Sequence, residues 1–206
     1  MNTLDKDEII VASKVHPARV SNIYLYGSRV YGTNDIDSDY DILLIGSSLL
    51  ESQELYIATP AHKYNIHIHV PSRFEDDLRK HDIHALECIW APEYAQIQVK
   101  RDYASEFKLD RMLMKKRLFG QSHDSWVKAC HKIKETDMYR GAKGIYHSLR
   151  ILMFGIQIAK HGKIVDFTEG NSLYNEIMSA DEYTWDYYKN KYLPIKKDLE
   201  NKLREA

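Results

Sequence analysis

The spacing of apolar residues changes near residue 100 and predicts two parts with different architectures. Before that point, short apolar runs are separated by residues that favour turns, which is typical of β-strands. Residues 53–60 are expected to be irregular or a short helix, and Ser72 is expected to cap a helix that enters at Arg73. We expect an opening helix over residues 4–15 and strands over residues 20–26, 39–45 and 64–70.

Beyond residue 103 the apolar residues recur three or four positions apart, which predicts helices. The longest helix is expected to end at His161, because Gly162 follows it. The chain is therefore predicted to be α+β. A small mixed sheet with helices should occupy residues 1–100 and a helical half residues 101–206. The expected helices of the second half cover residues 111–118, 125–136, 138–159 and 171–178.

Charge and cysteine content narrow the class of protein. The chain has 206 residues, with 29 basic and 30 acidic side chains, so no overall basic field favours tight nonspecific binding of nucleic acid. Contacts to RNA would be local, for example at residues 115–117. Cys88 and Cys130 lack a paired spacing, and no apolar run approaches the ~18 residues of a membrane span. We expect a cytoplasmic protein with free thiols and no membrane contact.

Two carboxylates begin the second expected strand. Asp39 and Asp41 are separated by one residue, so their side chains should project from the same face of the strand. Carboxylates that lie so close repel each other unless a cation lies between them. Oxygen ligands on a short strand suit Mg²⁺ or Mn²⁺. The sequence therefore predicts a metal site here.

A Gly-Ser turn follows the first expected strand. Gly27 permits a sharp turn, and Ser28 offers a hydroxyl and a backbone N–H where a short helix should begin and run to Gly32. Helix N-termini bind phosphate through their unsatisfied N–H groups. Arg29 and Ser38 are further candidates for contacts with phosphate. A phosphate-binding turn beside a metal site indicates phosphoryl or nucleotidyl transfer.

The order Gly-Ser, a spacer of about ten residues and Asp-x-Asp resembles the signature of the DNA polymerase β-like nucleotidyltransferase superfamily. The resemblance implies an NTP-dependent enzyme in which Gly27 and Ser28 hold the nucleotide phosphates and Asp39 and Asp41 bind Mg²⁺ or Mn²⁺. The motif covers about twenty residues. Over most of the first half, residues 62–92 above all, the chain also resembles predicted bacterial and phage nucleotidyltransferases associated with RNA repair.

The chain departs from the superfamily at the third carboxylate, which a later strand normally supplies. The strand expected over residues 64–70 contains no acid, and its polar face holds Asn65, His67 and His69. We match Asn65 to the missing position as a metal ligand. His67 is the candidate proton acceptor, since the pKa of histidine is ordinarily near 6.5. An active variant, a slow enzyme and a binding-only derivative all remain open.

In the helical half, four basic side chains recur at helical spacing, namely Arg140, Lys143, His147 and Arg150. Lys143 and Arg150 are candidates for nucleotide binding by a helical substrate domain, with the active site in the cleft between the two halves. A solvated helix face is the alternative interpretation.

We expect transfer of NMP from an NTP to an acceptor hydroxyl. An RNA 3′ end is the favoured acceptor, as the resemblance to RNA-repair relatives implies. Three alternatives stay open. The acceptor could be a protein partner, as in minimal nucleotidyltransferase antitoxins, or a small molecule, as in aminoglycoside-modifying relatives. The chain could also bind a nucleotide without transferring it.

Overall fold

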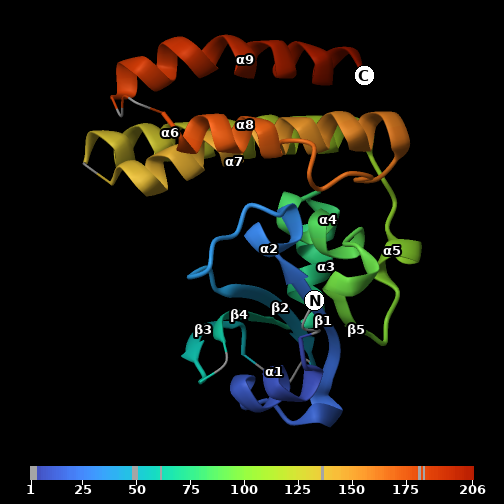
Figure 1. The fold of residues 1–206 in the computed structure, drawn as a ribbon. Helices are drawn as coiled ribbons and strands as arrows, with labels where there is room; N and C mark the ends of the chain where they lie inside the picture. The colour runs from blue at the N-terminus through green and yellow to red at the C-terminus, as the bar shows by residue number, and fades with distance from the viewer. Residues whose placement is uncertain (1–3, 48–50, 61, 136, 181, 183) are drawn as a thin grey trace. The chain divides into compact units, whose positions relative to one another are not determined.

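The computed structural model describes residues 4–47, 51–60, 62–135, 137–180, 182 and 184–206. The chain divides into two compact units, Met1–Lys108 and Leu109–Ala206. The first unit holds a five-stranded sheet with helices, and the described part of the second is helical (Figure 1). This confirms the predicted α+β fold class. None of the described helices is long and apolar enough to cross a membrane.

The first unit combines strands with short helices. Two 3₁₀ turns, Pro17–Arg19 and Glu93–Ala95, precede strands β1 and β5. The helices are α1 (Lys6–Ser13), α2 (Ser28–Tyr31), α3 (Pro71–Arg79), α4 (Ile83–Ile89) and α5 (Tyr103–Glu106). The strands are β1 (Val20–Tyr26), β2 (Tyr40–Gly46), β3 (Gln53–Ala58), β4 (Lys63–His69) and β5 (Gln96–Val99).

The sheet has the strand order β3-β4-β2-β1-β5. Strand β2 is central, antiparallel to β1 on one side and parallel to β4 on the other. In this register Asp41 lies opposite Tyr26 of β1 and opposite Asn65 of β4. The edge strand β3 pairs antiparallel with β4. Residues that lie far apart in the sequence therefore meet at the beginning of β2.

The two faces of the sheet differ in chemistry. One face is fully apolar at its centre, with Ile42 and Ile66 completely buried, and Figure 1 shows α1 on this side. Helices α3 and α4 cover part of the other face, where Tyr24 stacks on Phe74 with ring centroids 6.2 Å apart. Strand alternation places Asp41 on this second face, along with Asn65 and His67.

The second unit comprises α6 (Arg111–Lys134), α7 (Met138–His161), α8 (Asn171–Met178) and α9 (Trp185–Glu205). Helices α6 and α7 pack closely, since a Cβ added at Gly144 would lie 2.9 Å from the Cβ of Ala129. Reciprocal hydrogen bonds join them, with Ser122 Oγ donating to the carbonyl of Ser148 (2.9 Å) and Ser148 Oγ to that of Ser122 (2.8 Å). Gly162 ends α7 at φ +75°, as predicted.

Several sequence predictions of secondary structure were wrong. Residues 53–58 form strand β3, whose inward-facing Leu55 and Ile57 alternate with exposed neighbours. The helix after β4 begins at Pro71 rather than after a Ser72 cap, because proline is favoured in the first helical turn. The expected helices over 111–118 and 125–136 are one helix, α6, which runs through Gly120. Strand β5 and helix α9 were not predicted.

Candidate active site

The Gly-Ser turn lies where β1 ends. Gly27 has φ +79° and ψ −157°, a conformation restricted essentially to glycine. Its carbonyl accepts from the N–H groups of Val30 (3.0 Å) and Tyr31 (3.2 Å), which starts the short helix α2. The helix ends at Gly32 in the left-handed conformation. The turn, the short helix and its glycine terminus are thus confirmed.

Asp41 lies directly against this turn. A Cβ added at Gly27 would be 2.2 Å from Asp41 Oδ2, so the carboxylate occupies the space that a side chain at residue 27 would need. Asp39 lies one residue before β2, and its backbone carbonyl accepts from Arg29 Nε. The absence of a side chain at residue 27 therefore lets a carboxylate approach the backbone of the turn.

Asn65 is the neighbour of Asp41 on β4. Its Nδ2 donates to Asp41 Oδ1 across 3.3 Å. Its Oδ1 is buried and has no hydrogen-bond partner in the described part of the chain. A buried amide oxygen without a partner costs free energy unless a hydrogen-bond donor or a cation binds it. This oxygen and the neighbouring Asp41 carboxylate are the kind of oxygen ligands that Mg²⁺ or Mn²⁺ prefers, and Asp39 stays a predicted third ligand.

Nitrogen and sulfur ligands contribute no comparable site. No group of three or more His, Cys, Asp and Glu side chains in the described residues could hold a metal ion. The predicted ligands at β2 are not such a group, because one of them, Asn65, is an amide.

His67 follows on the same face of β4. Burial lowers its pKa, against the opposing influence of Glu54, and so favours the neutral ring. Its Nε2 lies 3.2 Å from Glu54 Oε1 on β3, where the two residues are direct partners in the strand pairing. The hydroxyl of Tyr56 donates to the same carboxylate and lowers the pKa of Glu54. The structure thus places an acid one strand beyond the position where the superfamily has its third carboxylate.

The sequence analysis missed Glu54, because residues 53–60 were not expected to form a strand. The alternation of Leu55 and Ile57 with Glu54 and Tyr56 was the signal that could have identified this strand. This signal is weak, because only two apolar residues mark the inward face of β3.

Arg29 and Ser38 hold the loop that leads into β2. Arg29 Nε donates to the carbonyl of Asp39 (3.0 Å), Nη2 donates to that of Ser38, and the guanidinium lies 3.8 Å from the centre of the Tyr40 ring. Ser38 Oγ donates to Asp35 Oδ1 across 2.8 Å. These side chains therefore order the segment before Asp39, and their contact with phosphate stays a prediction.

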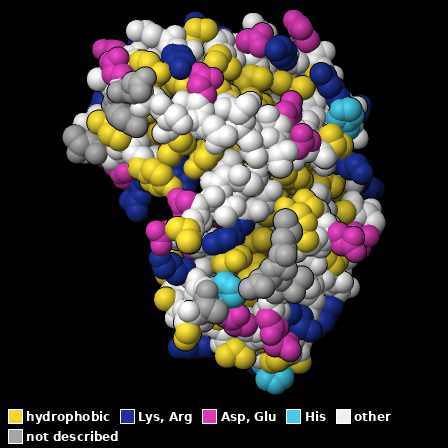
Figure 2. Space-filling view, in the orientation of Figure 1, with side chains coloured by type: hydrophobic (Ala, Val, Ile, Leu, Met, Phe, Trp, Pro, Cys, Tyr) yellow, Lys and Arg dark blue, Asp and Glu magenta, His cyan; other side chains and the backbone are white. Residues whose placement is uncertain are grey.

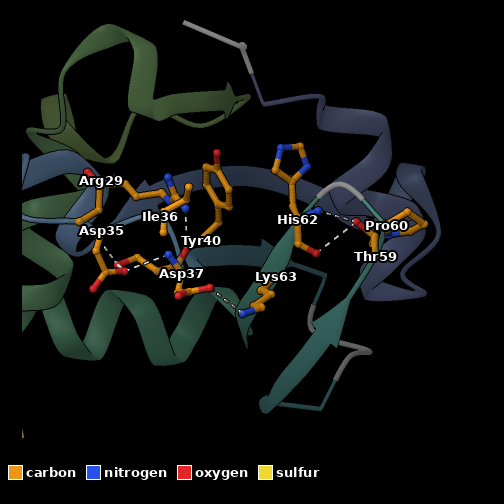
Figure 3. A pocket seen from close by; sticks show the side chains of 11 residues that line it. Arg29, Asp35, Ile36, Asp37, Tyr40, Thr59, Pro60, His62 and Lys63 are labelled. Atoms are coloured by element: carbon orange, nitrogen blue, oxygen red, sulfur yellow. Dashed lines mark hydrogen bonds and ion pairs between the residues drawn. The ribbon is translucent and has the colours of Figure 1, made fainter.

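Figure 3 shows the pocket beside this loop. It measures about 600 Å³, and strand alternation places its Tyr40 on the face opposite Asp41. Lys63 Nζ lies 3.6 Å from Asp37 Oδ1 at its rim. The pocket therefore adjoins the loop and not the carboxylate pair.

Lys143 and Arg150 lie on α7 in the second unit. Lys143 Nζ donates to the hydroxyl of Tyr139 (3.2 Å) and lies 4.9 Å from the centre of its ring. Arg150 is buried, with its guanidinium 5.7 Å from the ring of Tyr146 and its Nη2 2.9 Å from His147 Nδ1. Their predicted role in nucleotide binding remains a prediction, as does the substrate-binding role of the helical half.

Comparison with known proteins gives a match to one family in the first unit. Residues 10–103 match the sequence model of the family described as nucleotidyltransferase domain, which spans just under half of the chain. The first unit is therefore similar to a nucleotidyltransferase domain, and this match indicates a nucleotidyltransferase. The matched segment includes the Gly-Ser turn, Asp39 and Asp41, and β4.

Among solved structures, the chain is similar to a nucleotidyltransferase-like protein from Exiguobacterium sibiricum. The two share 14% sequence identity with a TM-score of 0.39, over 97% of this chain and 73% of the other. That similarity is too distant to position residues. No curated protein matches the chain.

Proposed function

We propose that the protein is a metal-dependent nucleotidyltransferase that moves NMP from an NTP to an acceptor hydroxyl, with an RNA 3′ end as the favoured acceptor. One observation carries the proposal. The Asp41 carboxylate lies against the Gly27 turn, next to the buried and unpartnered Oδ1 of Asn65. Metal ligands and a phosphate-binding turn are thus adjacent, as transfer from a triphosphate requires.

Asp39, Asp41 and Asn65 would hold the divalent cation. When bound, such a cation neutralises charge on the triphosphate and lowers the pKa of the attacking hydroxyl. The backbone N–H groups at Gly27 and Ser28 would bind the phosphates and align the α-phosphorus. Arg29 keeps the loop before Asp39 in place through its bonds to the Ser38 and Asp39 carbonyls.

His67 would take the proton of the acceptor hydroxyl. With Nε2 protonated and donating to Glu54, Nδ1 is the nitrogen that accepts. The acceptor oxygen bonds to the α-phosphorus, the bond to the pyrophosphate oxygen breaks, and the pyrophosphate leaves with its electron pair. The His67–Glu54 pair would thereby substitute for the missing third carboxylate as proton acceptor.

The choice of RNA follows from the resemblance of residues 62–92 to RNA-repair relatives. Basic and acidic side chains intermingle over the face drawn in Figure 2, and the net charge is −1. Recognition of RNA would therefore depend on local contacts and lose little affinity as salt rises. A reducing cytoplasmic setting, which the two free cysteines favour, is part of the proposal.

The test uses α-labelled NTP with total RNA, with cell protein or with no acceptor, each with and without Mg²⁺. We expect Mg²⁺-dependent label in RNA. It should fall by at least tenfold in Asp39→Ala and Asp41→Asn, given the usual about 10- to 100-fold effect of disturbing a metal site. Asp37→Asn is the matched control, because this carboxylate belongs to the same loop, is exposed and pairs with the likewise exposed Lys63.

Label in protein would instead select a protein acceptor, as in antitoxins that adenylylate a partner. Binding of NTP without any transfer would select a nucleotide-binding role, which the absence of a third carboxylate on β4 favours as the second candidate. Full activity of the Asp39→Ala/Asp41→Ala double variant would refute the metal site.

A further inference from the structure

A second cavity, of about 250 Å³, lies on the face of the sheet that carries Asp41. It is enclosed by β1, β2 and β4 and by helices α3 and α4, which come from the first unit alone. His67, the proposed proton acceptor, lines it together with His69. Because His67 belongs to both, the cavity adjoins the proposed active site.

The walls of this cavity suit a flat ring. Tyr26 and Phe74 line it, and the ring of His84 meets that of Tyr26 at 65° with centroids 6.2 Å apart. Flat aromatic walls bind planar heterocycles by stacking and edge contacts. The volume lies below the roughly 300–1,000 Å³ typical of pockets for drug-sized ligands, so one ring system fits better than a whole nucleotide.

His69 and Asp77 are polar groups of the cavity that a ligand can pair with. His69 Nδ1 is buried with no hydrogen-bond partner in the described part of the chain. It lies 3.6 Å from Asp77 Oδ2, which is too long for a hydrogen bond. The nearby Asp82 differs, since its Oδ1 accepts from the N–H of His84 and caps α4. A ligand that donates to Asp77 and pairs with His69 would satisfy both groups.

The charges of the cavity exclude a phosphate as its occupant. Arg73 contributes one positive charge, whereas Asp77 and Asp82 contribute two carboxylates. A neutral ring that bears an amino donor matches this lining better than an anion, because an anion would be repelled by the carboxylates.

The position also fits a nucleotide. His67 is two residues beyond Asn65 along β4, a distance of roughly 7 Å at the usual rise of a strand. That is comparable to the separation between the α-phosphate and the base within one nucleotide. A base in the cavity would therefore leave the α-phosphate beside Asp41.

We propose that this cavity binds the nucleobase of the incoming NTP, and that Asp77 and His69 select bases with an exocyclic amino group. The proposal rests on the proposed nucleotidyl transfer and specifies its substrate. Adenine, cytosine and guanine can donate to Asp77 through that group, whereas uracil cannot. The base and the phosphates would thus be recognised by different residues.

Isothermal titration calorimetry with Mn²⁺ can separate the two kinds of recognition. The ligands are α,β-methylene-ATP, α,β-methylene-UTP and inorganic tripolyphosphate, none of which can be transferred. We expect the ATP analogue to bind about tenfold more tightly than the UTP analogue or tripolyphosphate, as one hydrogen bond to a charged group provides. Asp77→Asn should abolish this preference and leave tripolyphosphate binding unchanged.

Asp76→Asn is the matched control, since Asp76 is the adjacent residue of α3 and pairs with Arg79 and Lys80 at the surface. Ala85→Leu, which fills the cavity, should reproduce the effect of Asp77→Asn. Circular dichroism verifies that each variant is folded.

Equal affinity of the wild-type protein for the ATP analogue and tripolyphosphate would overturn the proposal, as would equal loss of both in Asp77→Asn. Adenosine that binds through Asp77 but does not compete with the ATP analogue would overturn it by assigning the cavity to the acceptor. Failure of the proposed function looks different, because tripolyphosphate would then not bind with Mn²⁺ at all.

Discussion

Replacement of Gly27 by alanine tests how closely the glycine turn and the metal ligands depend on each other. Gly27 has φ +79° and ψ −157°, which an alanine adopts only under strain. The new Cβ would also lie 2.2 Å from Asp41 Oδ2 and 3.0 Å from Asp41 Cγ. The variant therefore perturbs the backbone and the carboxylate together.

The two effects have different sizes. Backbone strain of this kind costs about 1–3 kcal/mol of unfolding free energy. Ordinary van der Waals contact begins at 3.4 Å, so the carboxylate oxygen must retreat by 3.4 − 2.2 = 1.2 Å. Metal sites tolerate deviations of only about 0.2 Å in ligand distance. We expect the affinity for Mn²⁺ to fall by about 10- to 100-fold.

Gly162→Ala is the control for strain alone. Gly162 also has positive φ, at +75°, but no atom lies within 4 Å of the position of its new Cβ. Urea unfolding followed by circular dichroism should give a loss of about 1–2 kcal/mol for this variant. Its affinity for Mn²⁺, measured from the electron paramagnetic resonance signal of the free ion, should be unchanged.

Wild-type affinity for Mn²⁺ in Gly27→Ala would refute the reasoning, because the Asp41 carboxylate could then move by more than an ångström without consequence. An equal loss in both variants would show that the effect is global unfolding rather than displacement of a ligand.

Three further variants test other contacts of the first unit. Arg29→Met removes two hydrogen bonds and a cation–π contact and should destabilise the protein by about 2 kcal/mol in urea unfolding, whereas Arg79→Met, at an exposed ion pair, should change little. Burial lowers the pKa of His69 from 6.5 to about 4, so its contribution to stability is complete above pH 6.5 and is lost as pH falls toward 4. Unfolding free energy should therefore drop by about 2–3 kcal/mol more between pH 7 and pH 4.5 in the wild-type protein than in His69→Asn. Glu54→Gln should slow transfer in a single-turnover assay without weakening the binding of Mn²⁺, and an unchanged rate would exclude Glu54 as the partner of His67.

The sequence was sufficient wherever the signal was local. The strand that begins beside Asp39 and contains Asp41 was predicted to within one residue, and Gly27 and Gly32 bounded a helix of predictable position. These features depend on residues that are at most a few positions apart. The apolar run of β1 was equally clear, and its bounds were predicted correctly.

Features that depend on strand pairing were beyond the sequence. Asn65 faces Asp41 because β4 lies parallel to β2, and no local periodicity encodes which strands become neighbours, so only the resemblance to the superfamily indicated Asn65. Glu54 reaches His67 through the pairing of an edge strand whose apolar face has only two residues. In the helical half, two helices were expected over residues 111–118 and 125–136, but α6 runs through Gly120 between them, because a glycine inside a helix costs only about 1 kcal/mol.

The parallel pairing of β2 with β4 also couples ligand binding to folding. Asp41 and Asn65 are 24 residues apart in the chain, and the whole of β3 lies between them. An ion held by both would therefore close this long loop and stabilise the folded form over the unfolded one, by about 2.7 kcal/mol at a concentration of 100 times its dissociation constant. The melting temperature of the protein should consequently report occupancy of the site without any knowledge of the acceptor.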